Sequence, residues 1–197
     1  MRIKTKGLTP HVYEDDCPHN PRNDGCTDTM LCWHRKYNLG DENPYKSSQD
    51  FWGDKELQDS IFALKTIYML DHSGLRFSTS SSRFRAVDPQ GFDWGAVGVI
   101  YMTKDDAQRV YGDLSDESKQ KAEQGLTNEV EEYDRYHNTQ YYEYYIDGKE
   151  GEPLTGSSGY YGDSMAEVLE VMRDCADKKY RPLFDKALRQ FQSGAAM

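Results

Sequence analysis

Residues 30–45, MLCWHRKYNLGDENPY, place a Cys, a Trp, a His, two basic and two acidic residues and a Gly close together. Such a stretch either performs chemistry or forms a buried, hydrogen-bonded part of the fold. Its first residues alternate as in a strand, with one face made of Met30, Cys32 and His34 and the other of Leu31, Trp33 and Arg35. Turn-forming residues then end the strand. We interpret the stretch as architectural, with Leu31 and Trp33 in a core and Asp41 capping or pairing in the following loop.

The segments around this stretch predict further short strands and helices from their periodicity and turn residues. Strands are expected at 8–14, 29–37, 62–70, 75–80, 96–103, 139–147 and 154–162. Helices are expected from Ser47 or Ser48 to Ser60 and at 104–112, 115–138, 163–180 and 181–192. Because no βαβ rhythm is present, the sequence predicts an α+β fold, mainly an antiparallel sheet packed by several helices. We expect a single α+β domain over residues 1–177 and a basic C-terminal helix or tail over 178–197.

Composition narrows the class of protein. The chain has 197 residues, of which 37% are hydrophobic and 13% aromatic, including 15 Tyr. This aromatic content favours a globular chain over a disordered one. There is neither a run of about 18 apolar residues nor an apolar region of the secretory type near the N-terminus. We therefore expect a cytoplasmic protein with no membrane partner, whose four Cys residues are reduced thiols.

Charge is concentrated in one block of the chain. Residues 105–177 carry 19 acidic and 6 basic residues, whereas the last twenty residues carry 5 basic and 1 acidic. A protein that binds nucleic acid directly shows the opposite sign, so we expect no direct nucleic-acid partner. Seven carboxylates lie on the expected helix at 115–138, where we count only Lys119, Lys121 and Arg135 as neighbours. We predict a partner-binding surface made of these carboxylates and two Tyr side chains of the next strand, namely Asp116, Glu117, Glu123, Glu129, Glu131, Glu132, Asp134, Tyr142 and Tyr144.

Potential metal ligands cluster near the N-terminus. They are His11, Cys17, His19, Cys26, Cys32 and His34. Their spacing does not match the short C-x(2–4)-C pattern of zinc sites. A buried Cys beside a hydrogen-bonded His is the commoner arrangement. We therefore predict no metal ligand, although Cys32 and His34 share a strand face.

Hydrolysis is an open alternative with unspecific signals. His34, Asp41 and Asp71 are candidates for a metal-assisted acid–base site, together with Glu42 and His72. Residues 71–74, DHSG, look like a hairpin turn, because neighbours in a tight turn cannot face one another as a triad requires. The Gly-containing loops at 91–95 and 156–159 match no phosphate-binding motif, so no cofactor is predicted.

Several blocks of the chain resemble a family of small proteins of unclear function found in bacteriophages, plasmids and some bacteria. The blocks are TMLCWHRKYNLGDENPY (29–45), YMLDHSGLRFSTS (68–80), WGAVGVIYMTKDDAQRVYG (94–112), EVEEYDRYHNTQYYEYYID (129–147) and GYYGD (159–163). Family members carry similar CWHRRYNLGD, YDHSG, GxVGxIYVxK and EVExYDxY blocks in this order. The resemblance extends from about residue 8 to 163 and implies a mobile-element origin. It implies no catalytic residues.

These observations favour a non-enzymatic phage or mobile-element accessory protein. We expect it to bind and inhibit a host nucleic-acid-binding defence complex, of the anti-CRISPR or anti-restriction type. An acidic, Tyr-rich surface would occupy a basic groove that normally holds nucleic acid. Two other classes remain open, a small metal-dependent hydrolase or nuclease and a plain interaction or regulatory module.

Overall fold

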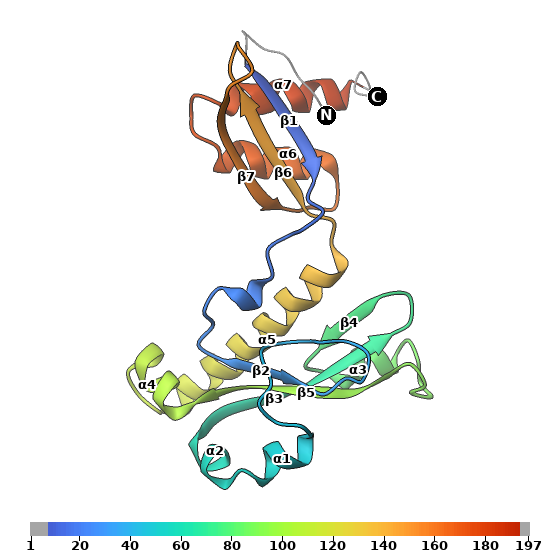
Figure 1. Cartoon of the computed structure of the whole chain (residues 1–197), viewed down its shortest axis with the longest axis vertical. Helices are drawn as coiled ribbons and strands as arrows, with labels where there is room; N and C mark the ends of the chain where they lie inside the picture. The colour runs from blue at the N-terminus through green and yellow to red at the C-terminus, as the bar shows by residue number, and fades with distance from the viewer. Residues whose placement is uncertain (1–7, 194–197) are drawn as a thin grey trace. The chain divides into compact units, whose positions relative to one another are not determined.

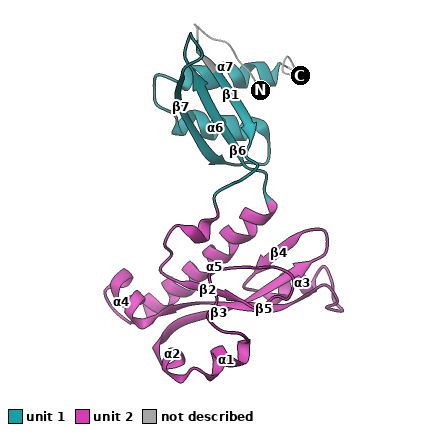
Figure 2. Ribbon diagram, in the orientation of Figure 1, with its two compact units in different colours: residues 1–19, 139–197 teal, residues 20–138 magenta. Residues whose placement is uncertain are grey.

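The computed structural model describes residues 8–193, which divide into two compact units (Figure 2). Unit 2 is Asn20–Asn138, and unit 1 combines the chain before residue 20 with the chain from Thr139 onward. Each unit is an antiparallel sheet with its own helices and hydrophobic core. The predicted α+β class is confirmed, with two separate sheets.

Unit 2 contains a four-stranded sheet in the order β2-β5-β3-β4, with every pair antiparallel. Its strands are β2 (Thr29–Cys32), β3 (Ile61–Asp71), β4 (Leu75–Ser78) and β5 (Trp94–Thr103). Its helices are η1 (Pro21–Asn23), α1 (Ser48–Gly53), α2 (Lys55–Ser60), α3 (Ser81–Arg85), α4 (Lys104–Tyr111) and α5 (Asp116–Asn138). The long helix α5 lies across one face of the sheet, and α1 and α2 lie on the other (Figure 1).

The four-stranded sheet has a hydrophobic cluster on each face, and strand β2 contributes side chains to both clusters, as its alternation predicts. Met30 and Cys32 pack with the α5 side chains Leu126 and Val130, whereas Leu31 packs against α1. Apolar residues recur on α5 at helical spacing, which gives the helix one buried stripe. Trp33 is only partly buried, at the edge of the cluster that contains Leu31.

Unit 1 contains a three-stranded antiparallel sheet in the order β1-β6-β7, with two helices on one of its faces (Figure 1). The strands are β1 (Thr9–Glu14), β6 (Tyr142–Asp147) and β7 (Pro153–Tyr160), and the helices are α6 (Met165–Cys175) and α7 (Arg181–Gln192). Val12, Tyr144 and Ile146 pack against Leu169 and Phe184 in the core. On the other face of the sheet, Tyr13 and Tyr145 are exposed among the described residues.

Most expected elements are present, with local differences that have physical reasons. The expected helix 48–60 is two short helices, because Asp54 leaves the helical conformation and caps α2 with its side chain. The segment between the strands expected at 75–80 and 96–103 contains α3, and the strand expected at 29–37 is shorter, because β2 ends at Cys32. The C-terminal segment expected from residue 178 forms the helix α7, which is not a separate tail because it shares a core with α6. The chain divides into its two compact units after residues 19 and 138, whereas a single domain ending at residue 177 was expected.

No helix within residues 8–193 has the length and apolar character needed to cross a membrane.

Candidate functional site

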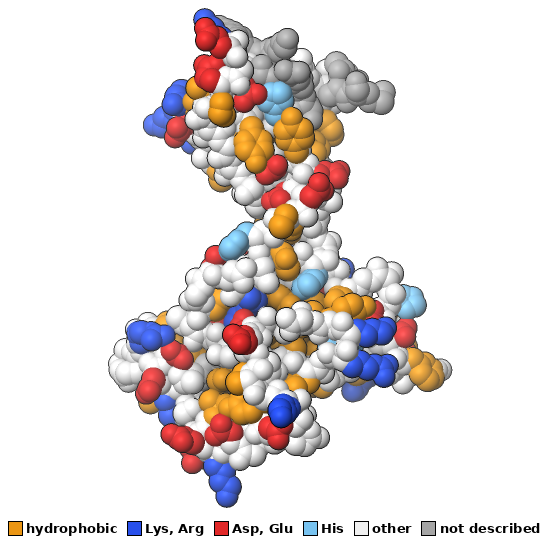
Figure 3. All heavy atoms as spheres, viewed as in Figure 1, with side chains coloured by type: hydrophobic (Ala, Val, Ile, Leu, Met, Phe, Trp, Pro, Cys, Tyr) orange, Lys and Arg blue, Asp and Glu red, His pale blue; other side chains and the backbone are white. Residues whose placement is uncertain are grey.

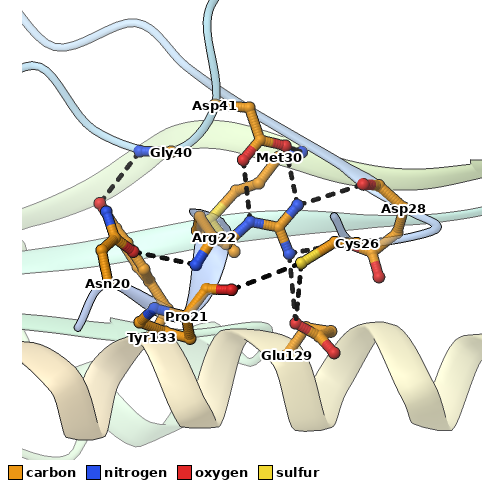
Figure 4. Close-up of polar contacts among 10 residues, drawn as sticks. All are labelled: Asn20, Pro21, Arg22, Cys26, Asp28, Met30, Gly40, Asp41, Glu129 and Tyr133. Atoms are coloured by element: carbon orange, nitrogen blue, oxygen red, sulfur yellow. Dashed lines mark hydrogen bonds and ion pairs between the residues drawn. The ribbon is translucent and has the colours of Figure 1, made fainter. Parts of the chain in front are cut away.

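The stretch 30–45 folds around a buried arginine from outside the stretch (Figure 4). Arg22, whose side chain is 2% exposed, holds Asp41 with two parallel bonds, from Nε to Oδ1 at 2.9 Å and from Nη2 to Oδ2 at 2.7 Å. Asp41 Oδ2 also accepts a hydrogen bond from the Met30 backbone N–H at 2.8 Å. The backbone of Asp41 donates in turn to the Met30 carbonyl at 2.8 Å. Asp41 therefore ties the loop to strand β2.

Two more carboxylates surround the same guanidinium. Arg22 Nη1 lies 2.9 Å from Asp28 Oδ1 and 3.2 Å from Glu129 Oε2 on α5. Burial raises the pKa of both Asp28 and Glu129, and the nearby positive charge of Arg22 only partly offsets it. The cluster thus joins the 20–28 segment, the loop after β2 and α5 in one ionic network.

Gly40, just before Asp41, is required by the close approach of this loop to β2. Its φ is +74°, and a Cβ atom there would lie 2.5 Å from the Met30 carbonyl oxygen. The Gly40 N–H donates to the Tyr133 hydroxyl of α5 at 3.0 Å. This geometry agrees with the architectural interpretation of the NLGD sequence.

The candidate hydrolytic residues do not form a common site. The His34 ring stacks on Tyr37 with centroids 5.0 Å apart, and Asp71 lies 3.9 Å from the Lys36 amine. Among the contacts of the described residues, none joins His34 to Asp41 or Asp71. Both Asp41 oxygens are already bound by Arg22, so this carboxylate is not available as a base.

The cysteines differ in environment. Burial raises the pKa of the Cys32 thiol to about 12, and burial also raises that of Cys26. Cys26 Sγ lies 3.6 Å from the Pro21 carbonyl, beside the Arg22 network. Cys17 is exposed and belongs to unit 1. Within residues 8–193, no three His, Cys, Asp or Glu side chains are arranged to hold a metal ion.

The predicted acidic surface on α5 is partly neutralised, by bases from elsewhere in unit 2 and by bases of the helix itself. Lys65 lies 3.1 Å from Glu123, and Glu129 belongs to the Arg22 network. Glu117 pairs with Lys121 at 2.7 Å, and Glu132 pairs with Arg135. Asp116 and Glu131 remain exposed on the helix. Lys65 and Arg22 are distant from α5 in sequence, so the neighbouring bases within the helix did not include them.

Asp134 does not lie on the surface. It is 5% exposed, and its Oδ1 accepts a hydrogen bond from the Phe77 backbone N–H of the edge strand β4 at 2.7 Å. Two arginines, Arg76 and Arg83, approach its carboxylate at 3.3 and 3.2 Å. Asp134 therefore accepts a hydrogen bond from a backbone N–H at the edge of the unit 2 sheet. Its predicted place on a partner-binding surface is wrong, because its side chain is buried.

The predicted Tyr pair lies on the inner face of the unit 1 sheet. Tyr144 is 5% exposed and packs against Phe184 with ring centroids 5.0 Å apart. Tyr142 points to the same face and is partly buried against that core. Tyr144 is thus a core residue, which corrects its predicted place on a binding surface.

The outer face of the same sheet carries the exposed aromatic side chains. Tyr13 on β1 is 50% exposed and Tyr145 on β6 is 44% exposed, and their ring centroids are 6.4 Å apart. His11 stacks on Tyr13 at 6.0 Å. The Tyr145 ring lies over Gly156 of β7, where a Cβ atom would be only 2.7 Å from the ring. The glycine therefore allows the ring to lie flat across the neighbouring strand.

Carboxylates flank these rings. The Tyr145 hydroxyl donates to Glu143 Oε2 at 3.0 Å, and this bond raises the pKa of Tyr145. His11 Nε2 lies 3.0 Å from Asp147 Oδ2. Figure 3 shows hydrophobic side chains next to acidic ones on this unit. We call the set Tyr13, Tyr145, Glu143, His11 and Asp147 the outer-sheet surface.

The outer-sheet surface suits a cationic partner. Tyr rings attract guanidinium and ammonium groups through their faces, and carboxylates beside them supply charge-assisted hydrogen bonds. The predicted surface included Tyr142 and Tyr144, which lie on the inner face of the sheet. The signal for the inner face is Ile146, an apolar residue that alternates in phase with these two tyrosines and is buried.

Comparison of the chain with protein-family models, curated proteins and solved structures finds no match.

Proposed function

We propose that this protein is a non-enzymatic accessory protein of a phage or mobile element that binds a basic surface of a host protein through its outer-sheet surface. The observation that carries the proposal is the pair of half-exposed rings, Tyr13 and Tyr145, with Glu143 and Asp147 beside them. An exposed patch of this kind on a rigid sheet is typical of an interaction site.

The charge of the chain supports a basic partner. The formal net charge is −10, and residues 139–177, which supply two of the three strands of this sheet, carry nine acidic and two basic residues. Opposite charge on the partner would speed association and select against acidic surfaces. A nucleic-acid-binding groove is the commonest strongly basic protein surface, and it is built to receive negative charge.

The proposed partner is therefore a nucleic-acid-binding complex of a host defence system in the cytoplasm, of the CRISPR or restriction type. The resemblance of the 29–45 and 94–112 blocks to mobile-element proteins supports this choice. A hydrolase built on His34, Asp41 and Asp71 is less well supported, because Arg22 occupies Asp41 and the other two side chains lie apart from it.

The test uses the full chain with an affinity tag, produced in bacteria that carry a CRISPR or restriction system. Capture of a subunit of that system, competed by its own nucleic acid, and improved plating of a targeted phage are the expected results. The double variant Tyr13→Ala, Tyr145→Ala should lose both.

Tyr37→Ala is the matched control, because Tyr37 is an exposed Tyr (37%) of unit 2 that stacks only on His34. It should behave as wild type. If the double variant captures the same complex as tightly as wild type, the outer-sheet surface is not the binding site. If no strain shows protection, the defence-inhibitor function is wrong.

A further inference from the structure

A second surface feature, on unit 2, has the opposite charge. The segment from His72 to Val87 contains Arg76, Arg83 and Arg85 and no acidic residue. Residues 20–138 as a whole carry 21 acidic and 14 basic residues. Figure 3 shows a group of Lys and Arg side chains on the side of unit 2 where β4 and the loop after β2 lie. This local excess of positive charge stands out on an otherwise acidic unit.

Arg76 and Arg83 are held side by side by one buried carboxylate. Arg76 Nε lies 3.3 Å from Asp134 Oδ1 and Arg76 Nη2 lies 3.3 Å from Asp134 Oδ2, and Arg83 Nη2 lies 3.2 Å from the same Oδ2. Arg83 Nη1 also donates to the Phe77 carbonyl at 3.4 Å. Asp134 is fixed in turn by the Phe77 N–H at 2.7 Å and by the Asn138 amide at 3.1 Å. Both guanidinium groups therefore share one rigid anchor.

This anchor leaves charge and donors unused. Two guanidinium groups share a single carboxylate, so Arg76, Arg83 and Asp134 together keep a net charge of +1. Each arginine side chain is 44% exposed. A guanidinium has five N–H donors in a planar fork, and each of these two spends only some of them on the contacts above. The remaining N–H donors of two neighbouring guanidinium groups suit an anion with several oxygens, as in arginine pairs that bind phosphate.

We propose that Arg76 and Arg83 form a binding site for a phosphate group of a small phosphorylated ligand. Asp134 acts as a positioning residue that sets the spacing of the two guanidinium groups. Arg85, exposed on the same short helix, adds positive charge to the surroundings. This site is independent of the outer-sheet surface, which lies in the other unit.

The test titrates the full chain with inorganic phosphate and, separately, with adenosine monophosphate, against sodium chloride at equal ionic strength. The side-chain Nε–Hε resonances of arginine in a ¹⁵N spectrum are the readout. Resonances of Arg76 and Arg83 should shift with phosphate and stay in place with chloride. Tighter binding of the nucleotide would identify a nucleotide as the source of the phosphate, and equal binding would identify the free anion.

Arg83→Gln should weaken phosphate binding by about 10- to 100-fold, as expected for loss of a charged hydrogen bond. It leaves Asp134 with Arg76, the Phe77 N–H and Asn138, so the anchor keeps partners. Arg109→Gln is the control, because Arg109 on α4 is a more exposed arginine paired with one carboxylate, Asp106. Shifts of all arginines alike, or none at Arg76 and Arg83 in wild type, would overturn the proposal whether or not the variants fold.

Discussion

Arg22 and Asp41, nineteen positions apart, form a bidentate ion pair with N–O distances of 2.9 and 2.7 Å in the interior of unit 2. The pair fixes the loop after β2 against the 20–28 segment, and Arg22 extends the connection to Glu129 on α5. The stretch 30–45, interpreted as architectural from the sequence, is thus part of a structural junction in unit 2.

Replacing Asp41 should therefore destabilise the fold. Asp41→Ala leaves the buried Arg22 still paired with Asp28 and Glu129 but removes the bidentate pair and the side-chain acceptor of the Met30 N–H, so we expect a loss of about 1.5–3 kcal/mol in the free energy of unfolding. Urea unfolding followed by circular dichroism measures it. Glu42→Ala, at the exposed neighbouring position, should change stability by less than about 0.5 kcal/mol. Wild-type stability of Asp41→Ala would point to a role outside the fold.

Gly40→Ala tests the close approach of this loop to β2. The new Cβ would meet the Met30 carbonyl at 2.5 Å in addition to the cost of a φ of +74°. Gly25→Ala is a matched control, because Gly25 has a φ of +71° and nothing within 4 Å of its Cβ position. We expect about 1–3 kcal/mol for the conformation in both variants and a larger loss for Gly40→Ala, measured by urea unfolding. Equal losses would show that the loop moves away without cost.

Two adjacent tyrosines should respond in opposite ways to truncation. Tyr144→Ala removes a core ring and should cost about 3–5 kcal/mol of stability. Tyr145→Ala removes an exposed ring and should leave the melting temperature nearly unchanged while weakening capture of the partner. Thermal unfolding and pull-down on the same samples give both quantities. A stable Tyr144→Ala protein that has lost binding would place the functional surface on the inner face.

Glu143→Lys and Glu131→Lys compare the two acidic surfaces. Each reverses one carboxylate, Glu143 on the outer-sheet surface and Glu131 on the exposed side of α5. We expect Glu143→Lys to slow association with the captured partner and Glu131→Lys to have little effect. Wild-type association should slow as added salt shortens the Debye length from about 10 Å to about 3 Å. The reverse ranking in surface plasmon resonance would restore the α5 surface as the binding site.

Stability should fall in strong alkali because of buried phenols and a buried thiol. Burial raises the pKa of Tyr133, Tyr144 and Cys32 to about 12 each. In the unfolded chain these groups ionise at about 10 for Tyr and 8.5 for Cys. Their protonated forms therefore favour the folded state, fully below the unfolded values, and this contribution is lost as pH rises through about 12.

Absorbance at 295 nm checks this prediction, because ionised Tyr absorbs there. The last Tyr ionisations, those of the buried rings Tyr133 and Tyr144, should coincide with loss of circular dichroism. Tyr144→Phe should remove one of these late ionisations. Complete ionisation of all tyrosines below pH 11 with the fold intact would contradict the assigned burial.

Local signals in the sequence predicted much of the fold. Alternation in β2 placed Met30 and Leu31 on opposite faces, and the helices expected after residues 103 and 162 are present, capped by the hydroxyls of Thr103 and Ser164. The α+β class followed from the order of these elements. Such features depend on residues within a few positions of one another, so a sequence read in short windows contains them.

Tertiary structure alone decided which polar residues are available for function. Arg22, Lys65, Arg76 and Arg83 reach α5 from distant positions and neutralise carboxylates that the helix sequence leaves unpaired. The helices α6 and α7, which follow β6 by many residues, bury Tyr144 and leave Tyr145 exposed. Ion pairing and burial depend on distance in space, and contacts between residues far apart in the chain are set only when the sheets and helices pack.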